Sequence, residues 1–187
     1  MVSQWFVVLI LLPFLQLAFT RIISLDEHFD GEDVKEDRFG IATSYVYRLT
    51  NKYLGPDLTF VSIVGYMEDG VKMDSIQGLG SEYWHFIRLG DNKYRIQNFV
   101  DDRTALDIHN GKMKNKVHMS KIGDFSGQYW HLTHLKDGSF RLSNDFSGRN
   151  MALDIIGGTH NLTMSTTAVD YLGQHWIFTK AGKYLKD

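Results

Sequence analysis

The chain has 187 residues, of which 43% are hydrophobic and 13% aromatic, and it contains 17 Gly, 2 Pro and no Cys. This mixture supplies enough apolar side chains for one core and excludes a disordered or fibrous chain. The formal net charge of −2 argues against the basic excess on which nucleic-acid binding depends. We therefore expect one globular domain without disulfides and without a nucleic-acid partner.

The first twenty residues are predicted to be a secretory signal peptide. The apolar run WFVVLILLPFLQLAF, from Trp5 to Phe19, is shorter than the roughly 20 residues that a helix needs to cross a bilayer. No Lys or Arg precedes the run, so an uncleaved signal anchor stays open as the alternative. The prediction is a secreted, extracellular protein with no integral membrane span.

Residues 21–44 are predicted to be an acidic leader or a removable pro-segment. Up to Gly40 this segment holds seven acidic and three basic residues, a local charge of −4. Its apolar residues follow no sustained period of 2 or 3.6, which is typical of a solvated segment. The remaining residues, 41–187, hold 17 Lys plus Arg and 15 Asp plus Glu, a net charge of +2, so they are nearly neutral.

Three tryptophans indicate an internal repeat. Trp84, Trp130 and Trp176 are each 46 residues from the next, within SEYW, GQYW and GQHW. Other motifs keep nearly the same spacing, namely YRL from Tyr47, YRI from Tyr94, FRL from Phe140, and ALDI from Ala105 and again from Ala152. A fixed period of this size is typical of repeated architecture. We predict repeats at about 45–90, 91–136 and 137–180, with each tryptophan in a shared core.

Within each repeat the pattern predicts short strands. The segments YRIQN, TALDI, KVHMS and YWHLTHL alternate apolar and polar residues, and DD, HNGK, GDFSG and KDGS stand between them as turn signals. Because side chains two apart on a strand point the same way, Leu106 and Ile108 are expected to face inward, as are Leu153 and Ile155. A β-propeller closes with four to eight blades, more than the three copies present. The predicted fold is all-β, a β-trefoil of three four-stranded repeats with pseudo-threefold symmetry.

The motifs together resemble the ricin B-chain-like (Q-x-W) β-trefoil lectin family, over residues 45–180. GQYW and GQHW carry the resemblance, with ALDI some twenty residues before each. In that family the aspartate of the L-D-I motif accepts hydrogen bonds from two adjacent sugar hydroxyls. By resemblance this role falls to Asp107 and Asp154. The first repeat has TFVS, from Thr59 to Ser62, at the matching place, so no sugar site is expected there.

Four further residues are expected to support the aspartates, two glutamines by the resemblance and two residues by their closeness to Asp107. Gln128 and Gln174 are expected to tie strand ends together and to orient the aspartates, because a carboxamide can donate to a carboxylate. His118 and Asn110 are expected to lie beside Asp107 and to contribute to the same pocket. The alternative is a purely structural role, in which Asp107 and Asp154 accept hydrogen bonds at strand ends and bind no sugar.

Two departures from the family predict weak sugar binding. The strand positions that would carry an aromatic ring hold Ser120 and Ser165 instead. Gly127 and Gly173 stand where an asparagine often precedes the glutamine. A pocket without a stacking ring loses much of its contact area, so low affinity is expected at each site.

Other chemistry is not indicated. The chain lacks a G-x-S-x-G motif, a cysteine nucleophile and an H-E-x-x-H motif, so we expect no enzyme, metal or cofactor. Asn161 opens NLT, an acceptor sequence for N-glycosylation. The expected partner is carbohydrate, and the rival interpretation is a protein-binding trefoil, such as a protease inhibitor or a secreted ligand.

Overall fold

The computed structural model describes residues 36–63, 70–78, 80–109, 111 and 115–184. The predicted signal peptide, residues 21–35 of the acidic segment and Asn110 lie outside these residues. Among the residues described, no helix has the length and apolar character needed to cross a membrane.

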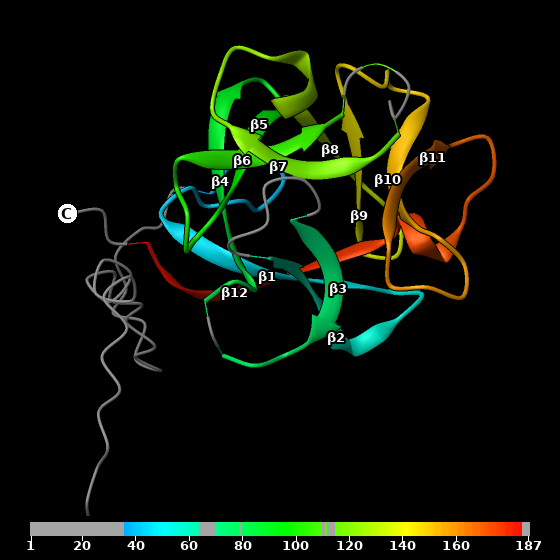
Figure 1. Cartoon of the computed structure of the whole chain (residues 1–187), viewed down its shortest axis with the longest axis horizontal. Coiled ribbons are helices and arrows are strands. Elements are labelled where there is room, and N and C mark those ends of the chain that lie inside the picture. The colour runs from blue at the N-terminus through cyan, green and yellow to red at the C-terminus, as the bar shows by residue number, and fades with distance from the viewer. Residues whose placement is uncertain (1–35, 64–69, 79, 110, 112–114, 185–187) are drawn as a thin grey trace, which may run out of the picture.

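Each predicted repeat contributes four strands (Figure 1). The first holds β1 (Tyr45–Asn51), β2 (Gly55–Ser62), β3 (Val71–Ser75) and β4 (Tyr83–Gly90). The second holds β5 (Lys93–Asn98), β6 (Thr104–Ile108), β7 (Val117–Lys121) and β8 (Trp130–His134). The third holds β9 (Phe140–Asn144), β10 (Met151–Ile155), β11 (Leu162–Thr166) and β12 (Trp176–Lys183). Short 3-10 helices, η2 (Ser126–Gln128) and η3 (Leu172–Gln174), precede β8 and β12.

The strand pairing is that of a closed barrel with three hairpins. Strands β1, β4, β5, β8, β9 and β12 pair in an antiparallel ring, which the β12–β1 pairing closes. The hairpins β2–β3, β6–β7 and β10–β11 lie on this barrel, one from each repeat (Figure 1). Closure leaves the barrel without a free edge. The prediction of an all-β, β-trefoil fold is confirmed.

The three tryptophans occupy equivalent places in the core, each with an exposed fraction of 0%. Their indole Nε1–H groups donate to the carbonyl oxygens of Phe60, Leu106 and Leu153, at 2.7, 2.9 and 3.0 Å. These matching bonds relate the repeats by the pseudo-threefold symmetry and place Phe60 in register with the two leucines.

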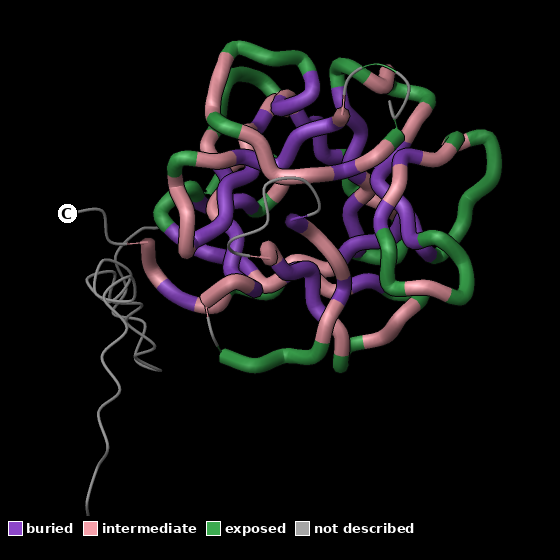
Figure 2. The backbone as a smooth tube through the Cα atoms, viewed as in Figure 1, coloured by how far each residue is buried: buried purple, intermediate pink, exposed green. Residues whose placement is uncertain are grey.

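The inward-facing positions expected from strand periodicity are also buried. Leu106 and Ile108 in the second repeat, and Leu153 and Ile155 in the third, belong to the main core cluster. In Figure 2 the buried segments run through the middle of the molecule and the exposed segments form its outer loops. The expectation that alternate residues of these strands face the core is confirmed.

Part of the acidic segment packs against the barrel. Ile41 and Ala42 are buried in the main core cluster, and the Ala42 N–H donates to the Tyr47 hydroxyl at 2.8 Å. Asp37 accepts hydrogen bonds from the Phe39 and Ile41 N–H groups, at 2.8 and 3.0 Å. Residues 36–44 are therefore an ordered part of the folded domain, which begins before the expected boundary at residue 45.

Candidate functional site

Asp107 and Asp154 lie near the ends of β6 and β10, and each is 6% exposed. In both, Oδ1 accepts the N–H of the following isoleucine, at 2.7 Å for Ile108 and 2.8 Å for Ile155. In both, Oδ2 accepts a hydrogen bond from the Q-x-W glutamine. Each ionised carboxylate oxygen has more than one acceptor direction, so these bonds orient the carboxylate and leave it able to accept others.

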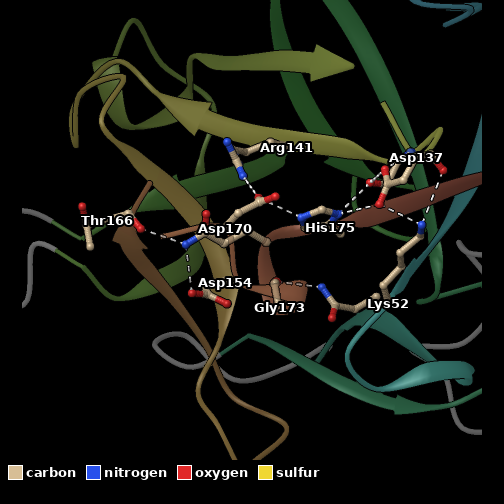
Figure 3. Close-up of polar contacts among 11 residues, drawn as sticks. Lys52, Asp137, Arg141, Asp154, Thr166, Asp170, Gly173 and His175 are labelled. Atoms are coloured by element: carbon tan, nitrogen blue, oxygen red, sulfur yellow. Dashed lines mark hydrogen bonds and ion pairs between the residues drawn. The ribbon is translucent and has the colours of Figure 1, made fainter. Parts of the chain in front are cut away.

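Gln128 and Gln174 join their aspartates to the neighbouring strand. Gln128 Nε2 donates to Asp107 Oδ2 at 3.1 Å and to the Lys121 carbonyl at 2.8 Å. Gln174 Nε2 donates to Asp154 Oδ2 at 3.2 Å and to the Thr166 carbonyl at 2.9 Å (Figure 3). Both glutamines are fully buried. The two sites therefore share one geometry.

The glycine before each glutamine leaves room for the carboxylate. A Cβ atom on Gly127 would lie 2.0 Å from Asp107 Oδ1, and one on Gly173 would lie 2.2 Å from Asp154 Oδ1. No side chain fits at these distances. In this chain an asparagine at either position would displace the aspartate, which explains the departure from the family pattern.

The second-repeat hollow, which surrounds Asp107, has a volume of about 240 Å³ and is also lined by His109, His118, Ser120 and Phe125. His118 stands opposite Asp107 in the β6–β7 pairing. The Phe125 ring is 52% exposed. Asn110 cannot be placed, since it lies outside the described residues.

The third-repeat hollow, which surrounds Asp154, is larger, at about 440 Å³. Its lining residues include Tyr53, Ile156, Thr163, Ser165, Tyr171 and Leu172. Tyr171 is 51% exposed and Tyr53 is 47% exposed. Tyr53 comes from the turn after β1, so the first repeat completes the site of the third.

The expectation that these pockets lack an aromatic wall is therefore wrong. The serines do line the hollows, but the rings come from the loops before η2 and η3. Phe125 and Tyr171 each stand two residues before the glycine, in DFSGQ and DYLGQ. That repeated aromatic was the signal that could have predicted them.

The first repeat is built differently. Phe60 accepts the Trp84 indole hydrogen bond, as Leu106 and Leu153 do for the other two tryptophans. The residue after Phe60 is Val61, which therefore stands where the other repeats have an aspartate. Glu82 replaces the glutamine and accepts the N–H groups of Gln77 and Gly78 at 3.0 and 2.9 Å, and it pairs with Arg48 at 2.9 Å. A hollow of about 360 Å³ remains beside these residues, without an aspartate at the equivalent position.

Three asparagines that none of the predicted motifs includes connect the repeats. Asn51, Asn98 and Asn144 end the first strand of each repeat. Their Nδ2 groups donate to the carbonyls of Gly173, Ser81 and Gly127, at 2.8, 2.8 and 2.6 Å. Each bond fixes the residue that precedes Gln or Glu in another repeat. Their spacing of 47 and 46 residues was the available signal.

A charged cluster lies beside the third-repeat hollow (Figure 3). The Lys52 ammonium and the Ser139 hydroxyl donate to Asp137 at 2.8 and 2.5 Å, and they hold the pKa of that carboxyl well below its usual range. The pKa of Asp170 is lowered by its contact with His175 and by the nearby Arg141. Both carboxylates therefore stay ionised near neutral pH.

Comparison with known proteins agrees with this geometry. Residues 80–168 match a family model described as ricin-type beta-trefoil lectin domain-like. The chain is a β-trefoil protein, and its resemblance to the ricin-type lectin family is confirmed over these residues. Such a lectin-like domain suggests carbohydrate binding. A search of curated proteins finds no match.

Solved structures share the fold. A mosquitocidal holotoxin has a TM-score of 0.68 and 18% identity, covering 78% of this chain and 18% of the toxin. The BEL beta-trefoil has a TM-score of 0.61 and 17% identity, covering 75% of this chain and 95% of its own. SeviL, solved with asialo-GM1 saccharide, has a TM-score of 0.57 and 20% identity, and the match covers 74% of this chain and 99% of SeviL. This chain spans about a fifth of the holotoxin, and likenesses at such identities show the fold alone.

Proposed function

We propose that the protein is a secreted lectin-like protein that binds extracellular or cell-surface glycans through Asp107 and Asp154. One observation carries the proposal: two repeats hold the same glutamine-oriented carboxylate at the edge of a hollow, each with an exposed aromatic ring. Charge-assisted hydrogen bonds to hydroxyls fix a sugar's orientation, and a ring supplies contact for its apolar face. The family match and the lectin folds support this proposal.

The third-repeat hollow is proposed as the stronger site, because it is larger and has two tyrosines. Asp154 is the one charged side chain among its described lining residues, so neutral sugars are favoured over acidic ones. The second-repeat hollow offers one ring and two histidines. Two weak sites on one rigid domain bind clustered glycans more tightly than either site alone, where the spacing fits.

Secretion is proposed from the apolar run of residues 5–19 and from Asn161. Asn161 is exposed on the turn between β10 and β11, and its carbonyl accepts the N–H of Ile156 at 3.0 Å. Ile156 lines the third-repeat hollow. A glycan on Asn161 would therefore stand close to the proposed sugar site and crowd it.

A glycan array tests the proposal with residues 21–187 in a tag-oligomerised form, which strengthens weak binding through avidity. Wild type is expected to bind a set of glycans that share one terminal sugar. The Asp107→Ala/Asp154→Ala double variant should lose at least roughly tenfold in signal, since each charge-assisted bond contributes about 1.5–3 kcal/mol.

Asp57→Ala is the matched control, because Asp57 is an exposed carboxylate of β2 that lines neither hollow. It should bind like wild type. Unchanged binding by a folded double variant would exclude the two aspartates as the site. An array without signal from folded wild type would favour the rival interpretation, a protein-binding trefoil.

A further inference from the structure

The two proposed sugar sites share one carboxylate geometry but have different walls. Two residues after its aspartate, the third repeat has Ile156 where the second has His109. Directly before the glycine that precedes the glutamine, the third repeat has Leu172 where the second has Ser126. Two positions beside each aspartate are therefore apolar in the third repeat and polar in the second.

Ile156 and Leu172 are exposed although both side chains are large and apolar. Ile156 is 44% exposed and Leu172 is 54% exposed, and both line the third-repeat hollow together with Tyr53 and Tyr171. A single exposed apolar side chain needs no explanation, whereas several gathered at one hollow are typical of a binding surface. The third-repeat hollow is thus a mostly apolar surface that contains one carboxylate.

Both apolar side chains belong to residues close to that carboxylate. Leu172 precedes Gly173, on which a Cβ atom would lie 2.2 Å from Asp154 Oδ1. Ile156 follows Ile155, whose N–H donates to the same oxygen at 2.8 Å. A sugar whose hydroxyls donate to Asp154 therefore lies within reach of both side chains.

The second-repeat hollow offers hydrogen-bonding groups instead. Its wall includes His109, His118 and Ser120, whose side chains donate and accept hydrogen bonds. Its volume is about 240 Å³, against about 440 Å³ for the third-repeat hollow. Such a wall favours a sugar that keeps all its hydroxyls, because a hydroxyl that leaves water needs a new partner.

We propose that the third-repeat site prefers a neutral sugar with a methyl group, in an acetamido or a 6-deoxy substituent, a preference that rests on the proposed sugar binding by Asp154. The methyl group leaves water for contact with Ile156 and Leu172, and its burial raises affinity about fourfold. A hydroxyl in the same place loses its bonds to water and finds no partner on these two side chains. The second-repeat site does not share this preference, so the two sites differ in selectivity.

Two-dimensional NMR of residues 21–187, produced in bacteria without a glycan on Asn161, observes the two sites separately. The probes are glucose, galactose and mannose, each titrated beside its 6-deoxy and its 2-acetamido-2-deoxy form. The amide signals of Ile156 and Leu172 should shift at an about fourfold lower concentration of one methyl-bearing form than of its parent sugar. The amide signals of His109 and Ser126 should show no such difference. The form that gives the difference identifies the substituent.

Exchanging the wall makes the test specific. The Ile156→His/Leu172→Ser variant keeps Asp154 and Gln174, so it should bind the parent sugar and lose the fourfold difference. Leu89→Ser is the matched control, because Leu89 is an exposed apolar residue of β4 outside the described lining of both hollows, and it should keep the difference. A difference that survives the exchange would overturn the proposal.

The titrations of wild type also distinguish this preference from the proposed function. Equal affinity of the third-repeat site for the parent sugars and for both methyl-bearing forms would overturn the preference and leave the sugar site standing. Signals of both sites that stay unshifted with every sugar, in a folded sample, would overturn the sugar sites and this preference with them.

Discussion

Substituting Gly173 by alanine should disable the third-repeat site without removing any of its polar groups. The new Cβ would lie 2.2 Å from Asp154 Oδ1 and 3.2 Å from the Ile155 nitrogen. To reach ordinary van der Waals contact the carboxylate oxygen must move by about 1.2 Å. That movement breaks the bonds from the Ile155 N–H, at 2.8 Å, and from Gln174, at 3.2 Å. With partial relaxation we expect a loss of about 2–4 kcal/mol in the free energy of unfolding.

Gly157→Ala provides the matched control, because Gly157 lines the same hollow and its added Cβ would meet nothing within 4 Å. It should stay within about 0.5 kcal/mol of wild type. Urea unfolding followed by tryptophan fluorescence gives both values, and glycan binding at the third-repeat site should be lost in Gly173→Ala alone. Equal unfolding midpoints for the two variants would refute the argument that Gly173 is required for space.

Three other predictions concern the core, acid stability and glycosylation. Trp130→Phe removes the bond to the Leu106 carbonyl and should cost about 2–4 kcal/mol in urea unfolding; a cost below about 1 kcal/mol would contradict the core role. Folding lowers the pKa values of Asp137 and Asp170. The ionised carboxylates therefore contribute fully to the stability of the folded protein above about pH 4, and this contribution is lost as the pH falls through their pKa values in the folded state. The melting temperature should therefore drop on acidification, and less so in Asp137→Asn. In a secretory host, Asn161→Gln should reduce the mass by one glycan and strengthen glycan binding; an unchanged mass would exclude glycosylation.

The fold could be predicted because each repeat must supply the same side chains to one core. Trp84, Trp130 and Trp176 fill equivalent places and donate equivalent hydrogen bonds, so their spacing in sequence records the symmetry directly. Strand periodicity predicted the buried face because alternate side chains of a strand point to opposite sides. The start of the domain could not be predicted from the sequence. Ile41 and Ala42 are core residues, but they follow an acidic segment whose composition is typical of solvent-exposed chain.

The site could be predicted only in part. Placement of Asp107 and Asp154 followed from the repeated L-D-I motif, which is local in sequence. Phe125 and Tyr171 could not be predicted from the strand pattern, because they lie in the loops before η2 and η3. The contribution of Tyr53 to the third-repeat hollow depends on closure of the barrel between β1 and β12, and no local pattern reports such a contact.

The most direct measurement is a crystal structure of residues 21–187 with the glycan that gives the strongest array signal. We expect density in the third-repeat hollow, with two sugar hydroxyls within about 3 Å of the Asp154 carboxylate and the apolar face of the sugar against the Tyr171 ring. Clear glycan density at another surface, with the hollows around Asp107 and Asp154 holding solvent alone, would contradict it.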